Sequence, residues 1–115
     1  MEQLNKVELR GNVGSYKLQT VGEKQVIRFT LATNYAYKDK TGAAQIETTW
    51  HNVVAWKGKG MECIDKIEKG SKIYVLGRIR CERYMGLDDV ERNTYEILAK
   101  KIEVVNNEEQ LSYEM

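Results

Sequence analysis

One strand is encoded by Thr49-Trp50-His51-Asn52-Val53-Val54-Ala55-Trp56, whose alternate positions carry indole rings and an amide. Because strand side chains alternate between two faces, the even spacing puts Trp50 and Trp56 on one face with Asn52 between them. Flat rings exposed in this way are suited to stacking on nucleobases. The alternative is that both tryptophans belong to an ordinary core, where this residue is commonly buried.

Length and composition describe one globular domain. The chain has 115 residues, of which 42% are hydrophobic and 30% charged, enough for a single core. We expect a domain over residues 1–105 and a short flexible C-terminal tail over residues 106–115. No apolar run approaches the ~20 residues that cross a bilayer, and the N-terminus lacks a signal-peptide pattern. We therefore expect a cytoplasmic protein with no membrane partner.

The residues that usually carry catalysis or metal binding are sparse. Cys63 and Cys81 are far apart, and His51 is the only histidine. No Cys/His cluster or triad-like spacing is present, and Asp88-Asp89 is interpreted as a solvated loop. We expect no enzymatic activity, no cofactor and no metal. The net charge of +1 neither supports nor excludes a nucleic-acid partner.

The first half of the chain predicts three strands. Alternating apolar residues favour strands over residues 4–13, 24–34 and 46–56. Residues 15–23 are predicted to form a loop. Residues 35–45 carry a hairpin-turn composition, which places Tyr37 on a hairpin arm.

The second half predicts a helix and two strands. Met61, Ile64 and Ile67 recur at helical spacing after Gly58-Lys59-Gly60. A long strand over residues 71–84 carries Ile73, Val75, Ile79 and Cys81 on one face, with Gly77 where that face must bend. Residues 91–105 are interpreted as a fifth strand, although residues 97–102 also suit a helix. This order predicts an all-β, five-stranded Greek-key OB-fold barrel with one helix between strands 3 and 4.

Four motifs in order resemble the bacterial single-stranded DNA-binding protein family over residues 4–105. They are Asn5-Lys6-Val7 leading into Gly11-Asn12-Val13-Gly14, then Phe29-Thr30-Leu31-Ala32-Thr33, Thr49-Trp50-His51-Asn52-Val53-Val54, and Lys69-Gly70-Ser71 opening a strand. The resemblance implies a protein that binds and protects single-stranded DNA during replication, recombination and repair. It also implies a homotetramer, with His51 near a subunit contact, associated with the nucleoid.

The resemblance implies four rings that stack on bases, and basic residues near them are expected to contact phosphates. The stacking positions are Tyr37, Trp50, Trp56 and Tyr84. The candidate phosphate contacts, each of which could instead be an ordinary solvated charge, are Lys38, Lys40, Lys57, Lys59, Lys69, Lys72, Arg80 and Arg83.

Two features depart from the family pattern. Tyrosine replaces the more usual tryptophan at Tyr37 and Tyr84, and Glu82 and Asp88-Asp89 add negative charge near a presumed binding strand. Weaker or more salt-sensitive binding is expected. The family's linker and acidic tip are matched only by the glutamates of residues 106–115, interpreted as a frayed terminus, which puts recruitment of replication and repair proteins through the tail in doubt.

Other functions suit the same barrel. A primosomal-type OB module would dock proteins and bind DNA weakly. An RNA-binding OB domain would use the same stacking and charge. An enzyme has the least support, because no nucleophile, base and orienting group can be assembled from these residues.

Overall fold

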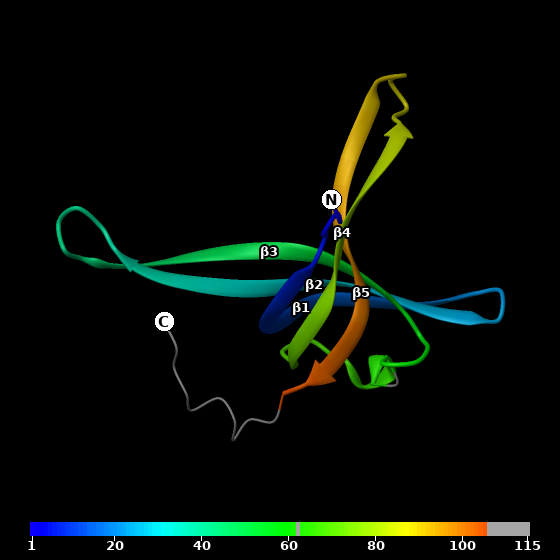
Figure 1. The fold of residues 1–115 in the computed structure, drawn as a ribbon, viewed down its shortest axis with the longest axis horizontal. Helices are drawn as coiled ribbons and strands as arrows, with labels where there is room; N and C mark the ends of the chain where they lie inside the picture. The colour runs from blue at the N-terminus through cyan, green and yellow to red at the C-terminus, as the bar shows by residue number, and fades with distance from the viewer. Residues whose placement is uncertain (62, 106–115) are drawn as a thin grey trace.

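The computed structural model describes residues 1–61 and 63–105 and contains five strands and one short 3-10 helix (Figure 1). The strands are β1 (Val7–Val21), β2 (Lys24–Lys38), β3 (Ala44–Trp56), β4 (Lys72–Met85) and β5 (Glu91–Val104), and the 3-10 helix η1 is Ile64–Lys66. Across the described ranges, no helix is both long enough and apolar enough to pass through a membrane.

The strands close into a barrel in the order β1-β2-β3-β5-β4. Neighbours pair antiparallel except β3 and β5, which run parallel and meet at Val53 with Ile97 and Val54 with Leu98. This is the strand order of an OB fold, so the predicted five-stranded barrel is confirmed. The fifth strand is also confirmed, because residues 97–102 pair with β4 and are not helical.

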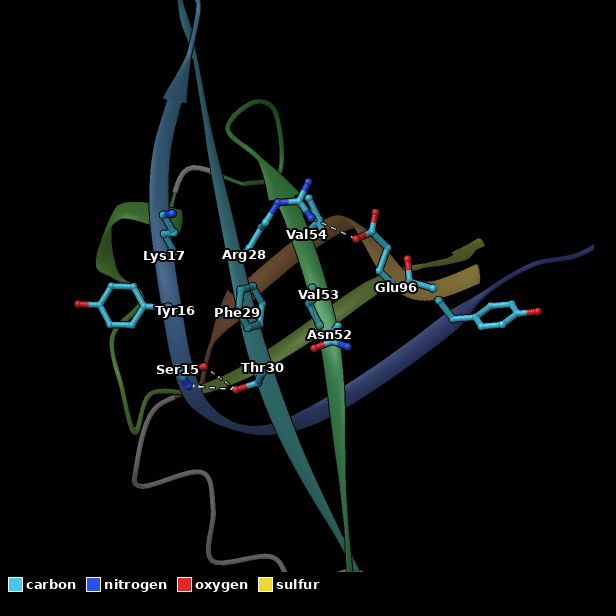
Figure 2. A pocket seen from close by; sticks show the side chains of 12 residues that line it. Ser15, Tyr16, Lys17, Arg28, Phe29, Thr30, Asn52, Val53, Val54 and Glu96 are labelled. Carbon is cyan, nitrogen blue, oxygen red and sulfur yellow. Dashed lines mark hydrogen bonds and ion pairs between the residues drawn. The ribbon is translucent and has the colours of Figure 1, made fainter. Parts of the chain in front are cut away.

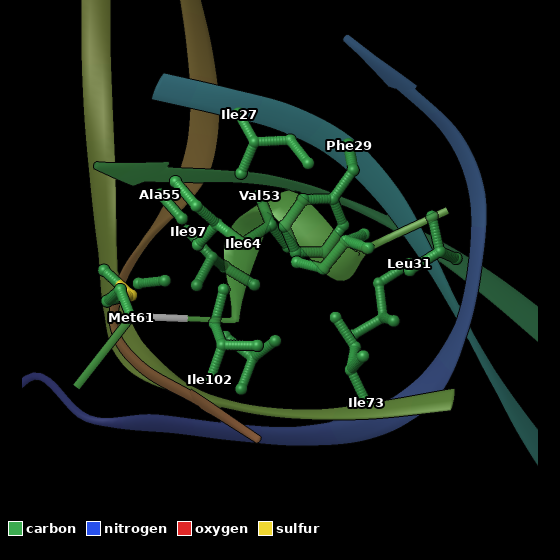
Figure 3. Packing of buried hydrophobic residues seen from close by; sticks show 14 residues of the cluster. Ile27, Phe29, Leu31, Val53, Ala55, Met61, Ile64, Ile73, Ile97 and Ile102 are labelled. Carbon is green, nitrogen blue, oxygen red and sulfur yellow. The ribbon is translucent and has the colours of Figure 1, made fainter. Parts of the chain in front are cut away.

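The barrel interior is filled by alternate side chains from all five strands (Figure 3). Ile27, Phe29 and Leu31 of β2 lie opposite Ala55, Val53 and His51 of β3 in the ladder. All of these except His51 are fully buried. Even-numbered residues of the same two strands lie on the opposite face, where Val26 and Val54 are also buried but both tryptophans are exposed.

The loop predicted over residues 15–23 is wrong, because β1 continues to Val21 and forms a hairpin with β2. The segment looked like a loop because it is polar and begins next to Gly14. A register shift between Val13 and Tyr16 accommodates that glycine without ending the strand. Only Gly22, with a φ of 63°, and Glu23 form the turn.

The predicted helix between strands 3 and 4 is also wrong, because only η1 forms there. Met61, Ile64 and Ile67 are all buried in the core. Their spacing is therefore explained by packing into the core and does not require an α-helix. Gly60 and Gly70 adopt φ values of 85° and 90° at either side. Left-handed residues this close together leave too short a segment for a stable α-helix, which is marginal below about 12 residues.

Gly77 marks the bend predicted in β4. The β4–β5 register shifts between Leu76 and Gly77, and a Cβ at Gly77 would lie 2.3 Å from the Leu98 carbonyl oxygen. The single apolar face expected along this strand is corrected, because Ile73 and Val75 are buried whereas Ile79 and Cys81 are exposed. Beyond the bend, β4 and β5 leave the barrel as a projecting hairpin (Figure 1).

Candidate nucleic-acid interface

Trp50 and Trp56 lie on the outer face of β3, as the even spacing predicts. Trp50 is paired with Ala32 and Trp56 with Val26, both even-numbered positions of β2. Trp50 is 59% exposed and Trp56 36% exposed. The ordinary-core alternative is therefore wrong for both rings.

Gly14 supports the Trp50 indole. A Cβ at Gly14 would lie 2.5 Å from Cζ3 of Trp50 and 2.8 Å from Oγ1 of Thr30, so no side chain fits between β1 and the ring. The register shift in β1 lies at this same glycine. The bulge thus lets the β1 backbone approach the indole and fixes its position, a role that the Gly-Asn-Val-Gly motif did not reveal in sequence.

An aromatic cleft of about 370 Å³ opens between the β2–β3 and β4–β5 hairpins. Trp50 lines it from β3, Ile79 from β4 and Tyr95 from β5. Tyr95 is 67% exposed and was not among the candidate site residues. The sequence signal for Tyr95 is its position two residues before the buried Ile97. This spacing puts Tyr95 on the same face of β5 as Ile97, at the point where the strand leaves the barrel.

A second depression of about 340 Å³, the β1–β3 groove, lies across the outer faces of β1, β2 and β3 (Figure 2). Tyr16 and Lys17 border it on β1 and Arg28 on β2. The backbone amide of Ser15 donates to Oγ1 of Thr30 at 3.0 Å, which joins the bulged part of β1 to β2. Tyr16, Lys17 and Arg28 are further residues that the sequence analysis missed.

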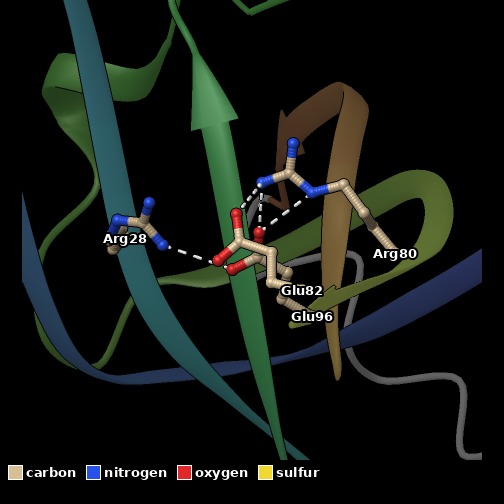
Figure 4. A network of polar contacts seen from close by, with 4 residues as sticks. All are labelled: Arg28, Arg80, Glu82 and Glu96. Atoms are coloured by element: carbon tan, nitrogen blue, oxygen red, sulfur yellow. Dashed lines mark hydrogen bonds and ion pairs between the residues drawn. The ribbon is translucent and has the colours of Figure 1, made fainter. Parts of the chain in front are cut away.

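Glu96 lines both depressions, as do Asn52 and Tyr95. Arg28 Nη1 donates to Glu96 Oε2 at 3.2 Å, and Arg80 donates to Glu96 Oε1 through Nε at 3.1 Å and also through Nη2 (Figure 4). Arg80 Nη2 also reaches Glu82 Oε1 at 3.1 Å. The hydrogen bond to Glu96 raises the pKa of the Arg80 guanidinium. The positive charge of Arg80, a candidate phosphate contact, is therefore already neutralised in the free protein.

The remaining candidate rings lie apart from the aromatic cleft. Tyr37 is near the tip of the β2–β3 hairpin and stacks on Tyr35, with ring centroids 6.3 Å apart. Tyr84 is near the tip of the β4–β5 hairpin, in register with Arg92. Trp56 is the last residue of β3 and lines neither depression. The structure therefore distributes the four rings over the surface, with only Trp50 in the cleft.

The candidate cations also differ in their surroundings. Lys38, Lys40, Lys59 and Lys69 are exposed and form no ion pair among the described residues. Lys57 lies 3.6 Å from Asp65, and Arg83 lies 4.0 Å from Glu91. Lys72 begins β4 and is half-buried.

The side chains considered for chemistry have structural surroundings. His51 Nε2 is 2.9 Å from the Thr33 hydroxyl, on the inner side of the β2–β3 ribbon. The Cys63 thiol donates to the Ile102 carbonyl at 3.3 Å. Asp88, in the turn before β5, forms an ion pair with Arg92 of β5 at 2.6 Å. Over residues 1–61 and 63–105, no three His, Cys, Asp or Glu side chains are grouped to hold a metal.

The β2–β3 turn is organised by Asp39. Its carboxylate accepts hydrogen bonds from the Thr41 hydroxyl at 2.6 Å, the Gln45 amide at 3.0 Å and the backbone amides of Thr41 and Ala43. Because these donors stabilise the charged form, they lower the pKa of Asp39 to about 2, with the Thr41 hydroxyl the largest cause. The turn therefore holds Lys38 and Lys40 on either side of a fixed carboxylate.

Comparison with known families supports the resemblance found in the motifs. The model of the single-strand binding protein family matches residues 4–105. A single-stranded DNA-binding protein 1 from Chlorobaculum tepidum is 38% identical over 79 residues, covering 67% of this chain and 49% of that protein. A single-stranded DNA-binding protein from Xanthomonas campestris is 35% identical over 104 residues, covering 89% and 60% respectively. The chain thus spans about half to three-fifths of the length of these relatives.

Solved structures show the same fold. The SSB of Plasmodium falciparum, in a complex with ssDNA, superposes with a TM-score of 0.77 at 28% identity, covering 91% of this chain and 96% of that one. A deletion mutant of the single-stranded DNA binding protein from Thermus aquaticus gives a TM-score of 0.75 at 24% identity, covering 90% and 51%. The second likeness concerns the fold alone.

Proposed function

Since the chain belongs to the single-strand binding protein family, we propose that it binds single-stranded DNA with little sequence preference and has no catalytic step. Stacking on aromatic rings accepts any base, because every base has a π-face. Contacts from lysine and arginine to phosphates are likewise independent of sequence. Such a protein holds DNA unpaired during replication, recombination and repair.

The observation that carries this proposal is the aromatic cleft. Trp50 and Tyr95 line one depression from two different hairpins, and both rings remain largely exposed. Two exposed rings at one site are accessible to a ligand that stacks on them. Each stacked base contributes about 1–3 kcal/mol by alanine substitution, so this cleft would be the centre of the binding path.

The other candidate residues would extend that path. Tyr37, Trp56 and Tyr84 would stack on bases on either side of the cleft, since each is at least partly exposed. Phosphates would be contacted by the basic candidates Lys38, Lys40, Lys57, Lys59, Lys69, Lys72 and Arg83. Arg80 would take part only after leaving Glu96. The arrangement supports a strand of DNA that wraps around the barrel and does not end in a pocket.

Assembly and location form part of the same proposal. We propose a homotetramer in the cytoplasm, associated with the nucleoid, in which one DNA strand contacts several barrels. The supporting likeness is to family members, one of which is an SSB complexed with ssDNA. Residues 106–115, whose role in recruiting replication and repair proteins the sequence puts in doubt, lie outside the described part of the chain.

The test is a titration of poly-dT against intrinsic tryptophan fluorescence, with the matching duplex as control. Stacking on Trp50 and Trp56 should quench emission with the single strand alone. Trp50→Ala and Tyr95→Ala should each lower the affinity by about 5- to 150-fold, the equivalent of one lost stacking contact. Leu18→Ala, at an exposed apolar position of β1 outside both depressions, serves as the matched control.

Other outcomes would point elsewhere. Unchanged affinity in both aromatic variants would contradict the proposal. A matched RNA oligonucleotide that outcompetes the DNA would indicate an RNA-binding domain. Absence of quenching by any oligonucleotide would favour a module that docks proteins.

A further inference from the structure

The aromatic cleft also carries polar side chains, which stacking alone does not require. Trp50 and Tyr95 supply its rings, and Asn52 and Glu96 belong to the same lining. Among the described residues, no lysine or arginine lines the cleft. A phosphate would therefore meet no cation here, whereas an uncharged base would meet flat rings and hydrogen-bonding groups. The volume of about 370 Å³ lies near the lower end of the range for small-ligand sites, about 300–1,000 Å³.

Asn52 and Glu96 are neighbours where β3 and β5 begin to separate (Figure 2). The parallel ladder pairs Val53 with Ile97. Extending that register by one residue places Asn52 opposite Glu96, with both side chains on the face that also carries Trp50. Adjacent strands are about 4.8 Å apart. The amide and the carboxylate are therefore close enough to contact two neighbouring atoms at the edge of one base.

The Trp50 indole lies next to this pair. Thr30 is the partner of Asn52 in the β2–β3 ladder. A Cβ at Gly14 would lie 2.5 Å from Cζ3 of Trp50 and 2.8 Å from Oγ1 of Thr30, so the ring extends over β2 at the level of Asn52. A base stacked on the exposed part of the indole therefore has its edge toward Asn52 and, beyond it, Glu96.

Glu96 is held in position as a hydrogen-bond acceptor. Arg28 donates to its Oε2, and Arg80 donates to its Oε1 through Nε and Nη2. An ionised carboxylate has about four lone-pair sites, so these hydrogen bonds leave about one of them, on Oε2. The Glu96 side chain is only 11% exposed, and neither arginine lines the cleft. A base in the cleft therefore meets a fixed carboxylate and not a guanidinium.

Asn52 supplies a donor beside that acceptor. Its side chain is exposed, and its amide carries two N–H donors. In an unpaired strand the Watson–Crick edge of each base is free for such contacts. Cytosine presents an amino donor at N4 next to an acceptor at N3, which matches Glu96 and Asn52 in that order. Thymine presents a carbonyl oxygen at C4, which would face the carboxylate.

We propose that the aromatic cleft reads one base of the bound strand and favours cytosine over thymine. Glu96 accepts a hydrogen bond from the N4 amino group and Asn52 donates to N3, while Trp50 stacks on the ring. This inference rests on the proposed function. It adds a base preference at one position of a path that otherwise accepts any base.

The test is a competition measurement. A labelled dT strand of about 12 nucleotides, a length that one OB fold can cover, is bound to the protein. Unlabelled dT, dU or dC of the same length displaces it, and fluorescence anisotropy follows the displacement. Because dU lacks the methyl group of thymine, it isolates the effect of the group at C4. Mildly alkaline buffer keeps N3 of cytosine unprotonated.

Glu96→Gln and Asn52→Ala each remove one member of the reading pair. The quantity compared is the ratio of dC affinity to dU affinity within each protein, so a general change in charge or stacking cancels. Glu82→Gln is the matched control, because it also removes a carboxylate that pairs with Arg80 but does not line the cleft. Circular dichroism verifies the fold of each variant.

The unmodified protein should bind dC about fivefold more tightly than dU, which corresponds to the lower end of a paired contact with a base. Glu96→Gln should bring this ratio close to one, whatever the freed arginines add to the binding of both strands. Asn52→Ala should lower the ratio about two- to threefold, as expected for one lost hydrogen bond. Glu82→Gln should keep the ratio of the unmodified protein.

Three results would overturn the base preference while leaving DNA binding in place. The first is a ratio of one or less in the unmodified protein. The second is the same ratio in the unmodified protein, Glu96→Gln and Asn52→Ala. The third is an equal fall in Glu82→Gln, which would assign the preference to Arg80 and not to the cleft. If none of the strands binds the unmodified protein, the proposed function is rejected as well.

Discussion

The β2–β3 and β4–β5 hairpins both project from the barrel and both carry a tyrosine near the tip, but they differ in how their charges are paired (Figure 1). In the β2–β3 hairpin, Lys38 and Lys40 form no ion pair within the described ranges. In the β4–β5 hairpin, Arg80, Arg83 and Arg92 each lie beside a carboxylate. Near its tip the first hairpin presents free cations, whereas these three arginines of the second are paired with carboxylates.

Under the proposed function, this difference would assign different contacts with DNA to the two hairpins. A phosphate that approaches Lys38 or Lys40 displaces only water and counterions, whereas one that approaches Arg80 must compete with Glu96 and Glu82. Charge attraction should therefore come mainly from the β2–β3 hairpin. The β4–β5 hairpin should act mainly through its rings, Tyr84 and Tyr95.

The largest effect should follow from removing the free cations of the β2–β3 hairpin. Lys38→Gln with Lys40→Gln should lower the slope of log K against log salt by about 1.4 and the affinity by about 25-fold at ~0.1 M salt, as expected for two lost phosphate contacts. Fluorescence titration with poly-dT measures both. Arg83→Gln is the matched change on the other hairpin and should alter the slope by less than half as much. Equal effects per charge would remove the distinction between the hairpins.

A smaller and opposite effect should follow from freeing the arginines. Glu96→Gln should raise the affinity for poly-dT about fivefold at ~0.1 M salt, because one more guanidinium becomes available to a phosphate. It should also lower the free energy of unfolding by about 1–3 kcal/mol, since a largely buried carboxylate and its charged hydrogen bonds are lost. Urea denaturation measures the second effect. Glu82→Gln, at an exposed partner of Arg80, should change stability much less.

The smallest effect is the loss of the Asp39 hydrogen bonds in the β2–β3 turn at low pH. The pKa of Asp39 is depressed to about 2 in the folded hairpin, against about 3.9 in an unfolded chain. Its stabilisation of the turn is therefore complete above pH ~4 and is lost as the pH falls toward 2. Chemical shifts of the Thr41 and Ala43 amides should stay constant down to pH ~4 and then move together. Asp39→Asn should abolish that transition, and a midpoint near pH 4 would contradict the hydrogen-bonded turn.

The period of two along β3 made one face of the site predictable from sequence. Alternation in β2 and β3 is local, so it fixes which residues point outward, and it placed Trp50 and Trp56 correctly. Alternation does not say how far two hairpins diverge. Tyr95 joins Trp50 only because β5 closes the barrel against β3, which no local pattern encodes.

Two other features of the structure were not predicted from the sequence, for related reasons. Residues 15–21 are polar and follow Gly14, so they resemble a loop, yet pairing with β2 carries them as a strand. Glu96 was not singled out because its partners Arg28 and Arg80 come from β2 and β4, distant in sequence and adjacent only in the folded barrel. The buried residues Met61, Ile64 and Ile67, in and around η1, led to the opposite error: they predicted a helix, but core packing and not an α-helix accounts for their spacing.

The parallel contact between β3 and β5 has a consequence for how the barrel assembles. It joins only two residue pairs, whereas β2 with β3 and β4 with β5 each join 13. The hairpins connect neighbours in the chain, but this seam must close a much longer loop, which costs more conformational entropy. The hairpins should form early and the seam last, so native-state amide exchange should part the barrel there first. The Arg28–Glu96 ion pair links β2 to β5 across this seam. Glu96, which neutralises the arginines, would therefore also stabilise the contact that forms last.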